Sequence, residues 1–365
     1  MTADDTHCLH RGAKTPPVPQ RWLFSPATDL AAFAGTALLS FAFATLAPSL
    51  GIPTDTPPWV WLLFVVFIDV AHVWATLFRT YLDGEELQRR PLLYAGAPLF
   101  AFAAGVILHA ISDALFWRAL AYVAAWHFIR QQVGWMVLYG RRAKSSEREI
   151  TFDRLAILAA TLGPVVWWHA NLPRTFWWFR ENDFISGLPA SVGTIALIIH
   201  ALVLISWLAH AVLTRTFHPG KTLLLFATWL AWFGGIVLAT SDLTFTVMNV
   251  ALHGVPYFIL LRRYQRSRVE ESGYGRLNKL LRYGLPVFLL LLLTLAFLEE
   301  LVWDQLVWHE HPMFFGAGGF DLPATLMTLI VPLLSLPQTT HYVLDGFIWK
   351  TRNDPHLTAR LGWHR

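Results

Sequence analysis

Four histidines in apolar stretches of this chain each have a polar residue three or four positions away. The pairs are Asp69 and His72, His127 and Gln131, Asn249 and His253, and His341 and Asp345. At these spacings both members of a pair lie on one face of a helix, a turn apart. Neutral imidazoles together with one or two carboxylates suit iron, zinc or copper better than magnesium or calcium.

We therefore expect a shared transition-metal site with six ligand candidates. They are His72, His127, His253, His341, Asp69 and Asp345. The two aspartates would bind the metal directly or orient the imidazole rings. Iron is the expected metal, as one ion or two, and zinc is the alternative. His200 and His210 are reserve ligands. Hydrogen bonding between helices, a proton path and a haem pocket are the competing interpretations.

Two arginines also occupy or border apolar stretches. Arg130 follows His127 by one helical turn and could bind an anionic group of a substrate or pair with Asp69 or Asp345. Arg130, Asp69 and Asp345 are therefore the candidate catalytic residues. A membrane arginine can instead extend its charged head to the interface along an apolar stem. We expect this of Arg79, near the end of its apolar stretch.

The composition indicates which elements must hold these side chains. Of 365 residues, 55% are hydrophobic and 14% are charged, and the mean hydropathy is +0.45. Soluble domains have about 25% charged residues, and a membrane-spanning helix needs about 20 mostly apolar ones. We predict an all-α polytopic bundle of about ten spans. They cover roughly 28–50, 58–82, 91–112, 114–140, 154–171, 190–214, 221–240, 243–262, 283–302 and 324–348.

The basic residues support this division. With ten spans, all Lys and Arg residues except Arg118, Arg174 and Arg180 fall on one side of the membrane. Cytoplasmic segments are enriched in Lys and Arg. We therefore expect a flexible cytoplasmic arm over 1–27, a transmembrane bundle over 28–350 and a cytoplasmic tail over 351–365. The expected location is the bacterial inner membrane. The single cysteine, Cys8, excludes a cysteine-based metal site within one chain.

The topology places the four histidines at similar depth. Their helices all run toward the cytoplasm, and each histidine precedes the basic end of its helix by about 7–14 residues. At 1.5 Å per residue this corresponds to about 10–21 Å. The four side chains could thus share one layer in the inner half of the bilayer and converge on a common centre.

Single histidines on separate helices, combined with an aspartate as in His341 and Asp345, resemble the bacterial β-carotene-cleaving dioxygenases. The resemblance implies a membrane iron oxygenase with a lipid or isoprenoid-like substrate. Membrane desaturases and alkaline ceramidases compare less well, because the chain has no His-x3-His pair and no His-x2-His-His box. The alternatives are a zinc-dependent lipid hydrolase, a proton-coupled transporter and a bis-histidine haem electron carrier.

The expected partners are membrane lipids and a hydrophobic small molecule, with no nucleic acid. The sequence does not decide whether the protein has a redox partner or forms a homo-oligomer.

Overall fold

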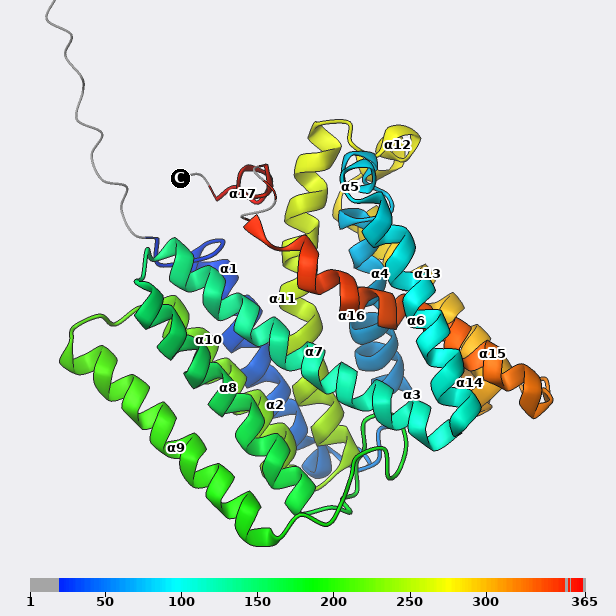
Figure 1. Cartoon of the computed structure of the whole chain (residues 1–365), viewed down its shortest axis with the longest axis horizontal. Helices are drawn as coiled ribbons and strands as arrows, with labels where there is room; N and C mark the ends of the chain where they lie inside the picture. The colour runs from blue at the N-terminus through cyan, green and yellow to red at the C-terminus, as the bar shows by residue number, and fades with distance from the viewer. Residues whose placement is uncertain (1–19, 352–353, 355, 364–365) are drawn as a thin grey trace, which may run out of the picture.

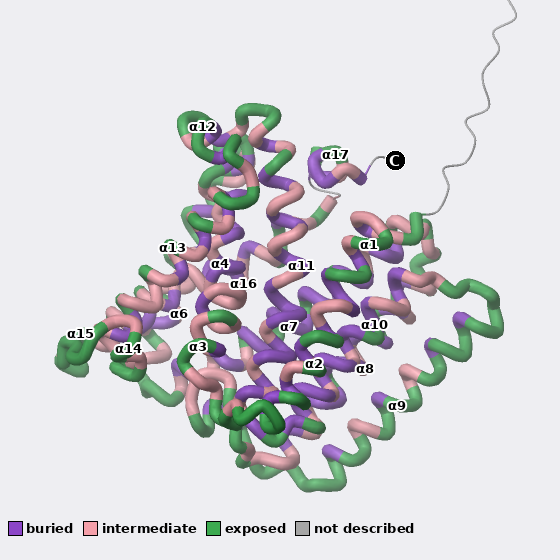
Figure 2. Tube along the Cα trace, turned by 180° about the vertical axis from the view of Figure 1, so that it is seen from behind, coloured by how far each residue is buried: buried purple, intermediate pink, exposed green. Residues whose placement is uncertain are grey.

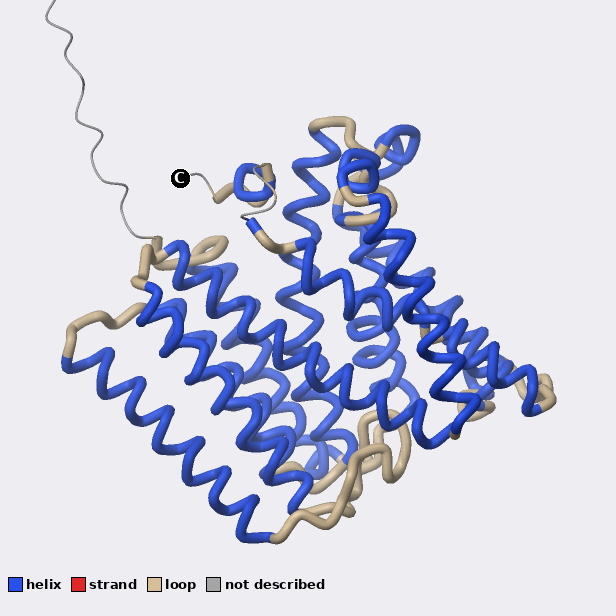
Figure 3. Tube along the Cα trace, viewed as in Figure 1, coloured by secondary structure: helices blue, strands red, loops and turns tan. Residues whose placement is uncertain are grey.

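The computed structural model describes residues 20–351, 354 and 356–363, and these residues form helices and loops with no strand (Figure 3). The predicted all-α fold is confirmed. Most of the N-terminal arm expected over 1–27, including Cys8, lies outside the described residues. Part of the tail expected over 351–365 lies outside them as well.

Eight helical segments of the described chain are long and apolar enough to cross a membrane. Several consist of consecutive α-, π- and 3-10-helical pieces without a break. The segments are Pro26–Leu50 (α1, η1, α2 and η2), Pro58–Arg79 (α3, η3, α4 and η4), Pro91–Ile111 (α6), Glu147–Ala170 (α8), Ala190–Leu213 (α9), Pro219–Val237 (α10 and η5), Asp242–Glu270 (α11) and Leu285–Trp308 (α13 and η7).

The two remaining predicted spans are helical but differ from the other eight. The span expected at 114–140 is α7 (Asp113–Arg142), a helix of 30 residues with more polar side chains. The span expected at 324–348 is divided into α15 (Ala324–Leu334) and α16 (Leu336–Ile348), of 11 and 13 residues. The break lies at Ser335 because Pro337 has no N–H to continue the ladder of hydrogen bonds. Eight of the ten predicted spans are therefore uninterrupted apolar helices.

The predicted separations between neighbouring spans are found in the structure. Ser112 has an extended backbone between α6 and α7. Ser241 caps α11 by accepting a hydrogen bond from the Thr244 N–H. Ser146 and Glu149 form a reciprocal capping box at the start of α8. Short helices occupy the connections: α5 (Gly84–Arg89), η6 (Gly275–Leu277), α12 (Asn278–Leu281), α14 (Pro312–Phe315) and α17 (Leu357–Arg360).

The arrangement of the helices brings four distant segments to the middle of the bundle (Figure 1). Helix α11 packs against α2, η3 and α4, and α16 packs against α4, α6 and α7. Helix α9 lies at the outside against α8 and is largely exposed, whereas α11 is mostly buried (Figure 2). The centre, where α4, α7, α11 and α16 meet, is therefore the place where side chains far apart in sequence can combine.

Candidate metal centre

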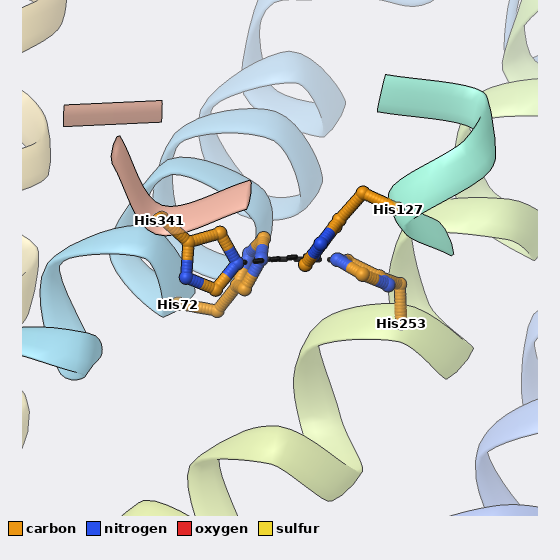
Figure 4. A group of neighbouring side chains, drawn as sticks. All are labelled: His72, His127, His253 and His341. Atoms are coloured by element: carbon orange, nitrogen blue, oxygen red, sulfur yellow. Dashed lines mark hydrogen bonds between the residues drawn. The ribbon is translucent and has the colours of Figure 1, made fainter. Parts of the chain in front are cut away.

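The four predicted histidines come together at this centre. His72 lies on α4, His127 on α7, His253 on α11 and His341 on α16. Each side chain is buried, and one ring nitrogen from each lies within 4.8 Å of the others. Figure 4 shows the four rings turned toward one another. A buried cluster that fits a metal ion is thus present in the membrane bundle.

The distances between the ring nitrogens suit a single ion. The Nε2 atoms of His72 and His253 are 3.0 Å apart, and those of His127 and His341 are 3.1 Å apart. Nitrogens that ligate one ion at about 2.0–2.1 Å stand about 3.3 Å apart at a tetrahedral angle and about 3 Å apart at a right angle. The cluster therefore has the dimensions of a coordination shell with only small adjustment.

Aromatic neighbours fix the orientation of two rings. The His253 ring lies parallel to Phe128, with centroids 3.5 Å apart. The His127 ring lies against Tyr342 at 4.6 Å. Two buried nitrogens, His72 Nδ1 and His253 Nδ1, have no hydrogen-bond partner in the described structure. Hydrogen bonds therefore do not satisfy all the ring nitrogens of the cluster and do not by themselves account for it.

A polar layer lies one helical turn beyond the histidines, toward the expected cytoplasmic side. Every histidine is followed four residues later by a polar side chain: Thr76, Gln131, Tyr257 and Asp345. Only Gln131 and Asp345 were singled out from the sequence. The same i,i+4 spacing would also have found Thr76 and Tyr257, because it places each of them on the face of its histidine.

Three members of this layer form a hydrogen-bonded chain that starts at the cluster. Thr76 Oγ1 lies 2.7 Å from His341 Nδ1 and 3.0 Å from the Tyr257 hydroxyl. The Tyr257 hydroxyl donates to Asp345 Oδ1 over 2.8 Å, and Trp349 Nε1 donates to the same oxygen over 2.7 Å. Asp345 therefore acts on His341 through two intervening hydroxyls.

Both predicted carboxylates lie beside the four histidines. Asp69 Oδ1 is 3.5 Å from His72 Nδ1, beyond a good hydrogen bond but close enough for a direct electrostatic interaction. Among the described residues the group of convergent donor atoms consists of the histidines alone. A ligand role for Asp69 or Asp345 stays a prediction, whereas the structure places Asp69 beside the His72 ring and links Asp345 to His341 through two hydroxyls. Asn249 donates to the Phe245 carbonyl within α11.

Cavities adjoin the cluster on two sides. One, of about 870 Å³, is lined by His127, Arg130, Tyr257, Tyr342 and Asp345, among other residues. The other, of about 660 Å³, is lined by Asp69, Glu299, Glu300, Trp61 and His311, among others. Arg130 thus borders a cavity that also reaches a ring of the cluster. No ion pair joins Arg130 to Asp69 or Asp345 in the described part of the chain.

The remaining histidines that were considered lie elsewhere. His200 bonds the Ala159 carbonyl through Nδ1 at 2.7 Å, and His210 packs on Phe152. Neither reserve candidate belongs to the convergent group. His309 lies in an exposed loop, whereas the His311 ring packs on Trp61.

The expectation that Arg79 extends to the interface is wrong. Its side chain is fully buried and pairs with Glu86 and Asp354, each at 2.7 Å. Burial alone would raise the pKa of Asp354, but the hydrogen bond from Arg89 and the charges of Arg79 and Arg89 lower it to about 2. The prediction was wrong because the sequence pattern shows only that Arg79 stands at the end of an apolar stretch. It does not show that other parts of the folded chain enclose its side chain.

Comparison with protein families, curated proteins and solved structures found no match to this chain. The conclusions therefore rest on the site itself: a helical membrane protein with a buried four-histidine cluster that could bind a metal ion.

Proposed function

We propose that this chain is an integral-membrane metalloenzyme, a non-haem iron oxygenase that acts on a lipid or isoprenoid-like substrate. The convergence of His72, His127, His253 and His341 carries the proposal. Four imidazoles contribute no charge to a dication, so nearby negative charge is needed in apolar surroundings. Asp69 supplies it beside the His72 ring, and Asp345 supplies it through the hydrogen-bonded chain of Tyr257 and Thr76.

An ion accounts for the cluster better than hydrogen bonding between helices does. In a purely hydrogen-bonded cluster, each close Nε2 pair needs one protonated and one bare nitrogen. The Nδ1 atoms of His72 and His253 lack partners with or without an ion, and each buried unsatisfied group costs about 1–3 kcal/mol. Coordination of one ion through the four Nε2 atoms uses all four lone pairs at once. The free energy of metal binding is far more favourable than the cost of the unpaired nitrogens.

The geometry favours a bare ion over haem. A haem iron held by two histidines has the flat macrocycle between their rings. Here every ring nitrogen of the convergent set is within 4.8 Å of three others, so the remaining two histidines occupy that plane. Four nitrogens at this separation surround one ion.

Four protein ligands also favour iron over catalytic zinc. Catalytic zinc is held by three protein ligands and keeps its fourth position for water, and four-ligand zinc sites are structural. A six-coordinate ion such as iron keeps two positions open with four histidines bound, and these supply the chemistry of O₂. The chain's own residues exclude water, orient His341 through Thr76, and admit an apolar molecule beside His127.

Metal analysis of purified protein tests the proposal. We expect about one transition-metal ion per chain, chiefly iron, and a fall in occupancy when any one of the four histidines is replaced by Ala. His200→Ala is the matched control, because His200 is also a buried histidine on a membrane helix but lies outside the cluster. His309→Ala controls for an exposed histidine. Both should keep full occupancy.

The outcomes separate the alternatives. Full occupancy in all four cluster variants would refute the shared site. Stoichiometric zinc without iron would favour the zinc-dependent lipid hydrolase over the iron oxygenase. A Soret band would indicate haem and contradict the geometric argument.

A further inference from the structure

The 870 Å³ cavity has properties that identify the kind of molecule it accepts. It lies between α7, α8, α11 and α16, and the ring of His127 forms part of its wall. Two of its lining side chains on α7, Val123 and Trp126, are 48% and 51% exposed. With α7 as the membrane span predicted from the sequence, this exposed face contacts lipid and the cavity opens sideways into the bilayer.

The charge of the cavity lining is strongly positive. Arg130, Arg141, Arg154 and Lys350 line it, against the single carboxylate of Asp345. That carboxylate already accepts hydrogen bonds from Tyr257 and Trp349. Arg141 pairs with Glu147, but the other three cations have no carboxylate partner among the described residues.

Unused hydrogen-bonding groups also line the cavity. The Gln131 side chain is 8% exposed, and neither its Oε1 nor its Nε2 has a partner in the described structure. Trp135 Nε1, in a side chain 3% exposed, also lacks one. Buried polar groups are nearly always satisfied by protein or by a bound molecule. These donors and the unpaired cations belong to the same cavity wall.

The size of the cavity limits the ligand to one chain. At roughly 30 Å³ for a water-sized group, 870 Å³ holds roughly 30 non-hydrogen atoms. This suffices for a single-chain lipid and falls short of a two-chain phospholipid. The lining follows one face of α7 from His127 to Arg141, a distance of about 21 Å at 1.5 Å per residue.

We propose that the cavity binds a single-chain amphiphile with an anionic head group and that this amphiphile is the substrate class of the site. The head group interacts with Arg130, Arg154 and Lys350, while the apolar chain lies among the aromatic residues beside His127. The assignment as substrate rests on the proposed function, but the binding does not. Anionic head groups are favoured because charge-assisted hydrogen bonds from arginine are about twice as strong as neutral ones.

The test compares binding of radiolabelled palmitate and hexadecanol, which share a chain length and differ in charge. The full protein is placed in nanodiscs of zwitterionic phosphatidylcholine at mildly alkaline pH. We expect tighter binding of palmitate than of hexadecanol. The Arg130→Gln/Arg154→Gln double variant should lose about tenfold in palmitate affinity and nothing for hexadecanol. The matched control, Arg276→Gln/Lys279→Gln, removes two exposed cations outside the cavity and should leave both affinities unchanged.

A second variant tests the place of binding without touching a charge. Gly134 lines the cavity, and a Cβ added there meets no atom within 4 Å. Gly134→Trp should therefore place a large side chain at the cavity wall from an unobstructed Cβ and should weaken both ligands; circular dichroism checks the fold of this variant. Metal content is measured on every sample, so loss of the metal site is distinguished from loss of ligand binding.

Three results would overturn the inference. Equal affinity of the wild type for palmitate and hexadecanol would remove the role of the cations. An equal loss in the control double variant would assign the effect to surface charge. Full competition by phosphatidylglycerol in the nanodisc would assign the cations to ordinary two-chain lipids. If metal is bound and palmitate is not, the proposed function stands and this inference fails.

Discussion

Replacing Thr76 by Val is a direct test of the hydrogen-bonded layer beside the cluster. Val has nearly the shape of Thr but cannot bond His341 Nδ1 or the Tyr257 hydroxyl, which lie 2.7 and 3.0 Å from Thr76 Oγ1. Tyr257 keeps its bond to Asp345. The main effect is therefore a His341 ring whose outer nitrogen has lost the partner that fixes its tautomer and orientation.

The size of the effect can be estimated in two ways. Leaving a buried polar group without a partner costs about 1–3 kcal/mol. Loss of the partner that orients a ligating histidine lowers metal affinity by about 10–100-fold, or about 1.4–2.7 kcal/mol. Both estimates agree, so we expect Thr76→Val to bind the metal about 10–100 times more weakly with little change in fold.

Competition against a chelator series measures this affinity, and circular dichroism checks the fold. Thr161→Val is the control, because Thr161 is equally buried on α8 but bonds only backbone carbonyls of its own helix. If Thr76→Val binds the metal within twofold of Thr161→Val and the wild type, then Thr76 does not orient a ligand and the reasoning is refuted.

The other predictions concern the carboxylates, the ionic cluster around Arg79 and the topology. Asp69→Asn and Asp345→Asn should keep the fold but hold the metal more weakly, because each removes negative charge near the cluster; metal content equal to wild type in both variants would contradict this. The Asp354 carboxyl has a pKa lowered from 3.8 to about 2, so its stabilising contribution is complete above about pH 4 and is lost as the pH falls through about 2. Asp354→Asn should therefore flatten the acid dependence of thermal unfolding between these values, and an unchanged profile would count against the ion pairs. Reporter fusions should read cytoplasmic and external in the order of the predicted topology, and an external reading after residue 355 would contradict it. The cytoplasmic positions are 85, 145, 218, 270 and 355, and the external ones are 54, 180 and 312.

The sequence was sufficient to predict which histidines meet. The alternation of basic segments gave their depth, and the spacing of polar partners gave the face of each helix. Neither pattern contains information on which helices are neighbours, so the link from His341 through Thr76 and Tyr257 to Asp345 was not foreseen. That link joins three helical segments, and only the packing of η4, α11 and α16 creates it.

The two errors have different origins. Hydropathy treats 324–348 as one apolar stretch, but Pro337 divides it into α15 and α16. Arg79 stands at the end of an apolar stretch, where an interfacial position is the ordinary expectation. Glu86 and Asp354 instead enclose it inside the protein. A local proline decided the first outcome, and a contact with a residue far along the chain decided the second.

The enclosure of Arg79 has a consequence for the synthesis of the protein. Asp354 lies 275 residues after Arg79, so the arginine enters the membrane long before this carboxylate has been made. Until the last helices are inserted, Glu86 alone balances a charge that ends up without contact to solvent. Both ion pairs of Arg79 can therefore form only after Asp354 has been synthesised. A nascent chain that stalls before Asp354 therefore contains an arginine with only one of its two carboxylate partners.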